Sequence, residues 1–122
     1  MKILVVDDSP TMRRIVCNAL NAIGYSELLE AADGCEALLK LSVVPIDFVI
    51  TDWIMPNMNG LTLTKTIRNH PDFRDLPVLM ITTRGMQEDV ISALYARVNS
   101  YIVKPFSPGT LREKIDLVLK TA

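Results

Sequence analysis

Short apolar runs alternate with longer stretches of helical periodicity along the whole chain. Four of the runs are continuous and rich in β-branched residues, and they cover Ile3–Val6, Phe48–Ile50, Val78–Ile81 and Tyr101–Val103. A strand that is buried on both faces has this pattern, because both faces need apolar side chains. A fifth run, Ser26–Ala31, is more polar. We therefore predict five strands, with Ser26–Ala31 at an edge of the sheet.

Apolar residues recur at helical spacing between these runs, which predicts five helices. Four of the helices open at residue types that favour a helix start. These openings are Ser9–Pro10, Asp33 with Glu36, Asn59–Gly60 and Pro108. The first helix ends at Gly24, and the fourth is expected to cover Gln87–Val98.

Strict alternation of strands and helices indicates the α/β class. It predicts a doubly wound, five-stranded parallel sheet that is flanked by five helices and connected by right-handed crossovers. A chain of 122 residues has the size of a single domain, so residues 1–122 are expected to form one domain. Open sheets of this kind bind ligands beyond the carboxyl ends of their strands. The residues that follow the strands are therefore the candidates for function.

Polar, chemically competent residues follow four of the predicted strands. They are Asp7 with Asp8, then Asp52, Thr82 and Lys104. Carboxylates gathered in one pocket repel each other, and a hard divalent cation such as Mg²⁺ relieves that repulsion. A metal, a lysine and a hydroxyl together can bind the oxygens of a phosphoryl group. Asp52 is the best candidate nucleophile because it leaves a central strand alone, whereas Asp7 and Asp8 are better metal ligands.

Composition and charge exclude several other classes of protein. Hydrophobic residues make up 49% of the chain and charged residues 22%, as in ordinary globular domains. The 13 basic and 14 acidic side chains nearly balance, so nothing calls for a nucleic-acid partner. Two cysteines without CxxC spacing and a single histidine form neither a disulfide scaffold nor a zinc site. Without a signal peptide or a long apolar stretch, we expect a cytoplasmic protein that does not insert into membranes.

The same strand-end residues carry a resemblance to a known family. The segments Val5–Asp8, Thr11–Val16, Asp52–Gly60 and Tyr101–Phe106, together with Thr82, resemble the response-regulator receiver family. The resemblance spans the whole chain and narrows to the single-domain chemotaxis regulators of that family. It implies a flavodoxin-like sheet with strand order 2-1-3-4-5.

The resemblance also implies roles for single residues at the strand ends. Asp52 would accept a phosphoryl group from a sensor histidine kinase or from a small phosphodonor. Asp8 and Asp52 would bind Mg²⁺ directly, with the backbone carbonyl of Ile54 as a third protein ligand and Asp7 acting through a water molecule. Lys104 would contact a phosphoryl oxygen.

A switch and a set of partners follow from the resemblance as well. Thr82 would turn its hydroxyl to the phosphoryl group, and Tyr101 would swing into the space that Thr82 vacates. The Lys104–Pro105 peptide would be cis. The fourth helix, fifth strand and fifth helix would then dock on a flagellar motor switch protein. The chain would act as a monomeric signalling switch and not as an enzyme. A phosphatase would be a further partner.

Four positions depart from the pattern of the family. Ile54 and Arg84 flank the expected route of the attacking water, where Ile54 would shield a phosphoryl group and Arg84 would pair with it, so we expect slow self-hydrolysis. Thr83, where a smaller residue is common, would tighten access to the site. Arg97 stands where many receivers have glycine at the end of the fourth helix, and we expect Asn99 to take the left-handed conformation instead.

Three alternatives stay open at this point. A relay receiver would pass its phosphoryl group to a histidine phosphotransfer protein. A Mg²⁺-dependent phosphohydrolase would need a general acid and a substrate-covering insertion, for which 122 residues leave little room. A flavodoxin-like redox carrier would need a phosphate loop rich in Ser, Thr and Gly, whereas the loop here begins with Asp7 and Asp8.

Overall fold

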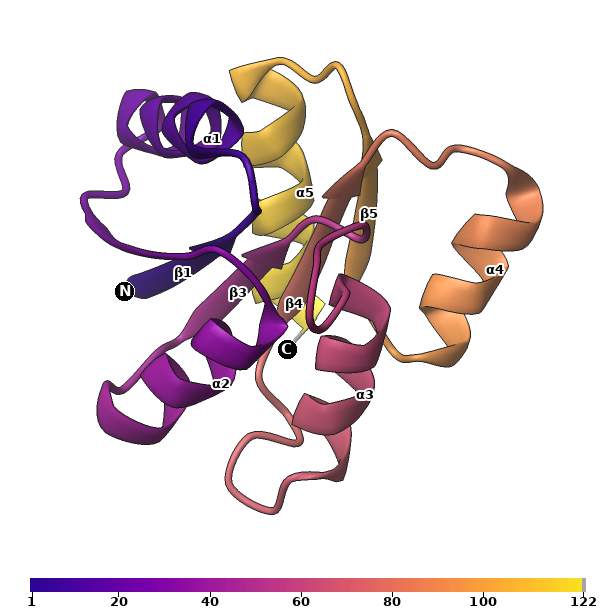
Figure 1. Cartoon of the computed structure of the whole chain (residues 1–122). Helices are drawn as coiled ribbons and strands as arrows, with labels where there is room; N and C mark the ends of the chain where they lie inside the picture. The colour runs from indigo at the N-terminus through magenta and orange to yellow at the C-terminus, as the bar shows by residue number, and fades with distance from the viewer. Residues whose placement is uncertain (122) are drawn as a thin grey trace.

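Five parallel strands form one sheet between two layers of helices in the computed structural model, which describes residues 1–121 (Figure 1). The strands lie in the order β2-β1-β3-β4-β5, as expected, with β2 at an edge. The strands are β1 (Lys2–Val6), β2 (Glu27–Ala31), β3 (Phe48–Thr51), β4 (Val78–Thr82) and β5 (Ser100–Val103). The helices are α1 (Pro10–Ala22), α2 (Gly34–Val43), α3 (Gly60–Asn69), α4 (Gln87–Tyr95) and α5 (Pro108–Thr121).

Each face of the sheet has its own hydrophobic core, which explains the continuous apolar runs. Leu4 and Val6 of β1 face α2, α3 and α4, and they pack in one cluster with residues such as Leu63. Ile3 and Val5 face the opposite way, toward α1 and α5. Figure 1 shows α1 and α5 together on one side of the sheet. Because successive side chains of a strand point to opposite faces, both sets must be apolar.

Helix capping follows the local sequence. The Ser9 side chain accepts a hydrogen bond from the backbone N–H of Met12 at 3.2 Å, and Pro10 begins α1. Asp33 caps α2 and Asn59 caps α3 in the same way, each with a backbone N–H to side-chain oxygen distance of 2.8 Å. The openings predicted for these three helices are therefore confirmed.

The end of α4 corrects two expectations. The helix stops at Tyr95 and not at Val98, and Arg97, with φ of 67°, takes the left-handed conformation that we expected at Asn99. The N–H of Val98 donates to the carbonyl of Ala93, and the N–H of Arg97 donates to that of Leu94. This is the Schellman pattern, which needs positive φ at the residue after the C-cap.

Asn99 has another function, because it joins β4 to the buried Arg68 of α3. Its Oδ1 accepts hydrogen bonds from the Val78 N–H and from Arg68 Nη2, both at 2.8 Å. Arg68 is only 8% exposed, and it also donates to the backbone carbonyls of Arg74, Leu76 and Arg97. A buried guanidinium is tolerated when its donors are paired in this way.

Within residues 1–121, no helix combines the length and the apolar character that crossing a bilayer requires.

Candidate functional site

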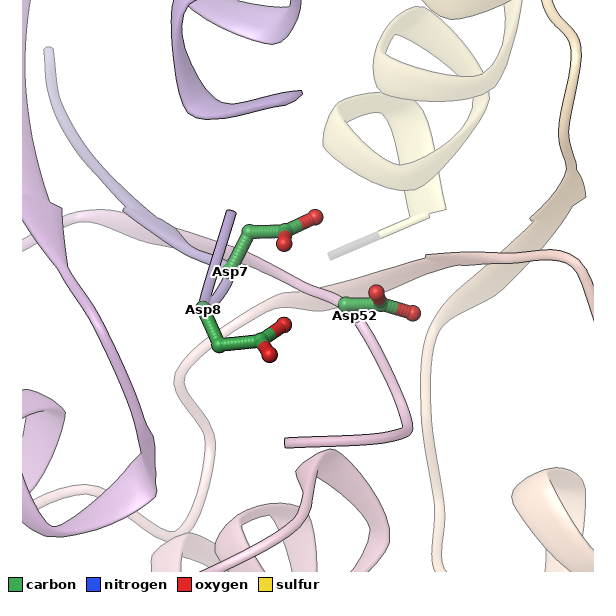
Figure 2. Close-up of side chains that lie close together, drawn as sticks. All are labelled: Asp7, Asp8 and Asp52. Atoms are coloured by element: carbon green, nitrogen blue, oxygen red, sulfur yellow. The ribbon is translucent and has the colours of Figure 1, made fainter. Parts of the chain in front are cut away.

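The carboxyl ends of β1 and β3 bring three aspartates together. Asp7 and Asp8 follow β1, and Asp52 follows β3. One carboxylate oxygen of each side chain lies within 4.8 Å of the others, and Figure 2 shows Asp7 and Asp8 extending from their loop toward the side of Asp52. Asp7 is buried, Asp52 is half-buried and Asp8 is exposed. The predicted acidic pocket therefore exists, and it opens to solvent on the side of Asp8.

Lys104 lies between two of these carboxylates. Its Nζ is 3.3 Å from Asp7 Oδ2 and 3.2 Å from Asp52 Oδ2. All three of these side chains are at most 14% exposed, so the ion pairs are only weakly screened by water. The Lys104–Pro105 peptide is cis, as expected. The ammonium group neutralises part of the acidic pocket and lies within reach of any group bound to Asp52.

Backbone hydrogen bonds hold the carboxylates in place. Asp7 Oδ1 accepts from the Ser9 N–H at 2.9 Å, and Asp52 Oδ1 accepts from the Trp53 N–H at 2.7 Å. The N–H of Asp52 donates to the Val6 carbonyl, which joins the two loops directly. The Asp7 and Asp52 carboxylates thus each accept a backbone hydrogen bond with one oxygen and pair with Lys104 through the other.

The donor set of the pocket fits a hard divalent cation. All candidate ligand atoms are carboxylate oxygens, and thiol and imidazole groups are absent from this cluster. Oxygens around Mg²⁺ lie at ~2.1 Å from the ion and hence roughly 3 to 4 Å from one another. The three carboxylate oxygens, which all lie within 4.8 Å of one another, need only small side-chain movements to reach that geometry.

Thr82 and Tyr101 lie beside the pocket on β4 and β5. Thr82 is buried at the end of β4, and its Oγ1 accepts a hydrogen bond from the Arg84 N–H at 3.4 Å. The half-buried Tyr101 donates its hydroxyl to the backbone carbonyl of Arg84. Burial, followed by the nearby Asp89 carboxylate, raises the pKa of Tyr101, so the phenol remains a donor at neutral pH. Both side chains therefore contact the same loop after β4.

Trp53 and Arg84, which follow β3 and β4, contact each other beside the pocket. Trp53 is only 7% exposed and belongs to the core next to α2, α3 and α4. The Arg84 guanidinium lies over its ring at 4.4 Å, and the Tyr101 ring meets it edge-on at 6.5 Å. Arg84 also pairs with Asp89 of α4 at 2.7 Å. Arg84 thus joins the residue after Asp52 to the first turn of α4.

Some contributors to the site were not expected from the sequence. Asp89 anchors Arg84, and Gly60 allows α3 to begin against the backbone of Asp52. Gly60 follows the cap residue Asn59, which signals a helix start but says nothing of close approach. In the sequence, Asp89 is simply an acidic residue in the first turn of a helix, where acidic side chains are favoured. Ile54 lies in the loop after Asp52 and is 58% exposed.

Comparison with known proteins agrees with this geometry. A family model described as "Response regulator receiver domain" matches residues 3–116. The chain is 53% identical to "Chemotaxis protein CheY1" of Helicobacter pylori (strain ATCC 700392 / 26695), with 99% of this chain and 98% of the relative covered. It also resembles the solved structure of Vibrio cholerae chemotaxis protein CheY4, with a TM-score of 0.88, 37% identity and coverage of 96% and 97% of the two chains.

A second solved structure is informative about the pocket. It is the receiver domain of a sensor histidine kinase from Pseudomonas aeruginosa PAO1, described with a magnesium ion coordinated in the active site cleft. Its TM-score to this chain is 0.84 at 28% identity, and the match covers 96% of each chain.

Proposed function

Since the chain belongs to the response-regulator receiver family, we propose that it is a phosphorylation-activated switch of a two-component chemotaxis system. In this proposal residues 1–122 work as one receiver domain in the cytoplasm, and a CheA-like sensor histidine kinase is the phosphodonor. The observation that carries the proposal is the position of Lys104 Nζ, 3.2 Å from Asp52 and 3.3 Å from Asp7. A cation in that position can stabilise negative charge that develops on a phosphoryl group at Asp52.

The proposed chemistry is transfer of a phosphoryl group to Asp52. The free carboxylate oxygen of Asp52 attacks phosphorus, the bond between phosphorus and the donor nitrogen or oxygen breaks, and the donor leaves with the electron pair. Asp52 Oδ1 stays on the Trp53 N–H, so Oδ2 is the attacking atom. Lys104 then exchanges its contact with Asp52 for a phosphoryl oxygen.

Asp7, Asp8, Asp52 and the Ile54 carbonyl are the proposed holders of Mg²⁺. When bound, the cation would neutralise charge on the carboxylates and on the incoming phosphoryl oxygens. The all-oxygen donor set and the magnesium-bound receiver of the P. aeruginosa kinase support this choice. Asp8 is the most accessible of the three carboxylates, as an entry ligand should be.

The proposed switch couples Asp52 to α4 through Thr82 and Tyr101. Contacts of Thr82 with a phosphoryl group would release its Oγ1 from the Arg84 N–H and so shift the loop whose carbonyl accepts from Tyr101. Phosphorylation then acts by favouring one of two arrangements of this loop, which is a population shift. Arg84 carries that change to Asp89 at the start of α4.

The face formed by α4, β5 and α5 is the proposed docking surface for a flagellar motor switch protein. On α4, Ile91, Leu94 and Tyr95 are 44%, 55% and 85% exposed and line a groove of about 300 Å³. On β5, Val103 is 43% exposed. Exposed apolar groups gathered in this way are typical of surfaces that bind protein partners.

Phosphorylation is expected to raise the affinity for a motor switch protein roughly 5- to 150-fold, the usual range of such couplings. Fluorescence anisotropy of the labelled partner, with and without acetyl phosphate and Mg²⁺, measures this gain. Leu94→Lys should abolish it, because a charge would enter the apolar groove of α4. The control is Leu39→Lys, since Leu39 is 69% exposed on α2.

Two results would contradict this chemotaxis output. One is equal affinity of both forms for the motor switch protein. The other is rapid transfer of the phosphoryl group to a histidine phosphotransfer domain in the absence of motor-switch binding, which favours a relay receiver.

Replacing the exposed Ile54 by asparagine is expected to shorten the lifetime of phosphorylated Asp52 about fivefold, the rate equivalent of one net hydrogen bond of about 1 kcal/mol. The reason is that the amide can orient an attacking water, whereas the Ile54 side chain only shields the pocket. The decay of Trp53 fluorescence after dilution from acetyl phosphate gives the lifetime. Ile91→Asn on α4 is the control, and an unchanged or longer lifetime in Ile54→Asn would refute the shielding role.

A further inference from the structure

Arg13 of α1 makes a contact with the acidic pocket that the proposed roles do not use. Its Nη1 donates to the backbone carbonyl of Asp7 at 2.6 Å, and its Nε donates to Glu30 Oε1 of β2 at 3.0 Å. The Arg13 side chain is 18% exposed, so this bridge is partly shielded from water. One guanidinium thus ties the turn between β1 and α1 to the neighbouring strand.

The carbonyl of Asp7 belongs to the peptide that joins Asp7 to Asp8. Because this peptide is planar, fixing its oxygen also fixes the direction of the Asp8 N–H and the position of the Asp8 Cα. The Asp7 N–H is held by the Ala31 carbonyl at 3.1 Å, and the Ser9 N–H by Asp7 Oδ1 at 2.9 Å. Arg13 restrains the turn at a further point, the peptide bond between Asp7 and Asp8, through its hydrogen bond to the Asp7 carbonyl.

We propose that Arg13 is a positioning residue for the cation site: it holds the Asp7–Asp8 peptide so that both carboxylates face Asp52. The inference rests on the proposed function, because it assumes that the three aspartates bind Mg²⁺. Partners that orient ligands from outside the coordination sphere typically change metal affinity about 10- to 100-fold when they are removed. Arg13 would do so through a backbone carbonyl and not through a carboxylate.

The charge of Arg13 predicts the opposite sign, which makes the proposal testable. A guanidinium near a cation site repels the cation, so removing its charge alone should tighten Mg²⁺ binding. Glu30 at 3.0 Å offsets much of that charge. Removal of a positioning contact should instead weaken binding. The direction of the change therefore separates positioning from electrostatics.

The test compares Arg13→Met with Arg14→Met. Arg14 is the next residue of α1, it is exposed, and its side chain forms no hydrogen bond or ion pair within residues 1–121. Both variants remove one positive charge from the same helix turn. Titration with MgCl₂, followed by Trp53 fluorescence without phosphodonor, gives the half-saturating concentration. This signal is suitable because the Trp53 N–H donates to Asp52 Oδ1.

We expect the half-saturating Mg²⁺ concentration to rise about tenfold in Arg13→Met and to stay equal or fall slightly in Arg14→Met. Phosphorylation by acetyl phosphate should be slow in Arg13→Met at low Mg²⁺ and return to the native rate at saturating Mg²⁺. Glu30→Gln should weaken Mg²⁺ binding only slightly, because glutamine still accepts the Arg13 Nε–H and only the offset of the Arg13 charge is lost.

Three outcomes would overturn the proposal. Mg²⁺ binding by Arg13→Met that is as tight as in the native chain or tighter shows that only charge matters. A lower melting temperature with unchanged Mg²⁺ affinity shows a purely structural role. If the native chain shows no response to Mg²⁺, both this inference and the proposed function are wrong. The first two outcomes contradict only the role of Arg13 and leave the proposed function intact. If Arg13→Met fails to fold, Arg13→Gln replaces it under the same criteria.

Discussion

In the presence of Mg²⁺ and acetyl phosphate, the native chain is expected to gain one phosphoryl group, and the Asp52→Asn variant is expected to gain none. Asparagine keeps the size of the side chain and its oxygen for the Trp53 N–H, but it has no anionic oxygen to attack phosphorus. The intact mass after incubation measures the gain. Trp53 fluorescence in the same sample reports whether the pocket responds.

The loss of phosphorylation in Asp52→Asn should be complete, and it should not result from unfolding of the variant. Lys104 still pairs with Asp7, so the variant keeps one of the two ion pairs of Lys104 and loses one of three mutually repelling charges. Its thermal melting should therefore match that of the native chain. Asp8→Asn is the matched control, because it should still be phosphorylated on Asp52 but should need more Mg²⁺. A full mass gain in Asp52→Asn would place the phosphoacceptor elsewhere and contradict the proposed chemistry.

Gly60→Ala is expected to destabilise the fold by about 3 kcal/mol, at the upper end of overpacking effects. A Cβ at this position would overlap the carbonyl oxygen of Asp52 and lie 2.9 Å from its carbonyl carbon. These are backbone atoms, so no side chain can turn away to make room. The start of α3 would therefore have to move. That movement would disturb the hydrogen bond that the Gly60 N–H donates to the Trp53 carbonyl at 2.8 Å.

Gly109→Ala is the matched control for Gly60→Ala. Gly109 also lies in the first turn of a helix, but its added Cβ would meet only the Ser107 Oγ, at 3.7 Å. Alanine there should be neutral or stabilise by about 0.4–1 kcal/mol. Urea unfolding of both variants gives the two free energies. Similar stability of Gly60→Ala and the native chain would show that α3 does not depend on close approach to Asp52.

Much of the architecture can be derived from local patterns alone. The continuous run Ile3–Val6 indicates burial on both faces, the more polar run at residues 26–31 indicates an edge, and both indications are confirmed. The alternation of strands and helices then leads to a parallel sheet, whose carboxyl ends must meet at one edge. That reasoning, which uses only the order of the elements, is enough to predict that Asp7, Asp8 and Asp52 lie together.

Contacts between the side chains at that edge could not be derived in this way. Lys104 pairs with Asp7 across 97 positions of the chain, Arg84 stacks on Trp53, and Arg97 takes the left-handed conformation instead of Asn99. The first two depend on distances between elements that are far apart in the sequence, whereas the Arg97 conformation follows from the residue at which α4 ends.

The physical reason is that periodicity reports which side of an element is buried, whereas a hydrogen bond or an ion pair requires positions correct to a few tenths of an ångström. The sequence therefore establishes which residues share the edge of the sheet. Only packing of the completed sheet and helices decides which of them touch, as when Arg13 donates to the carbonyl of Asp7.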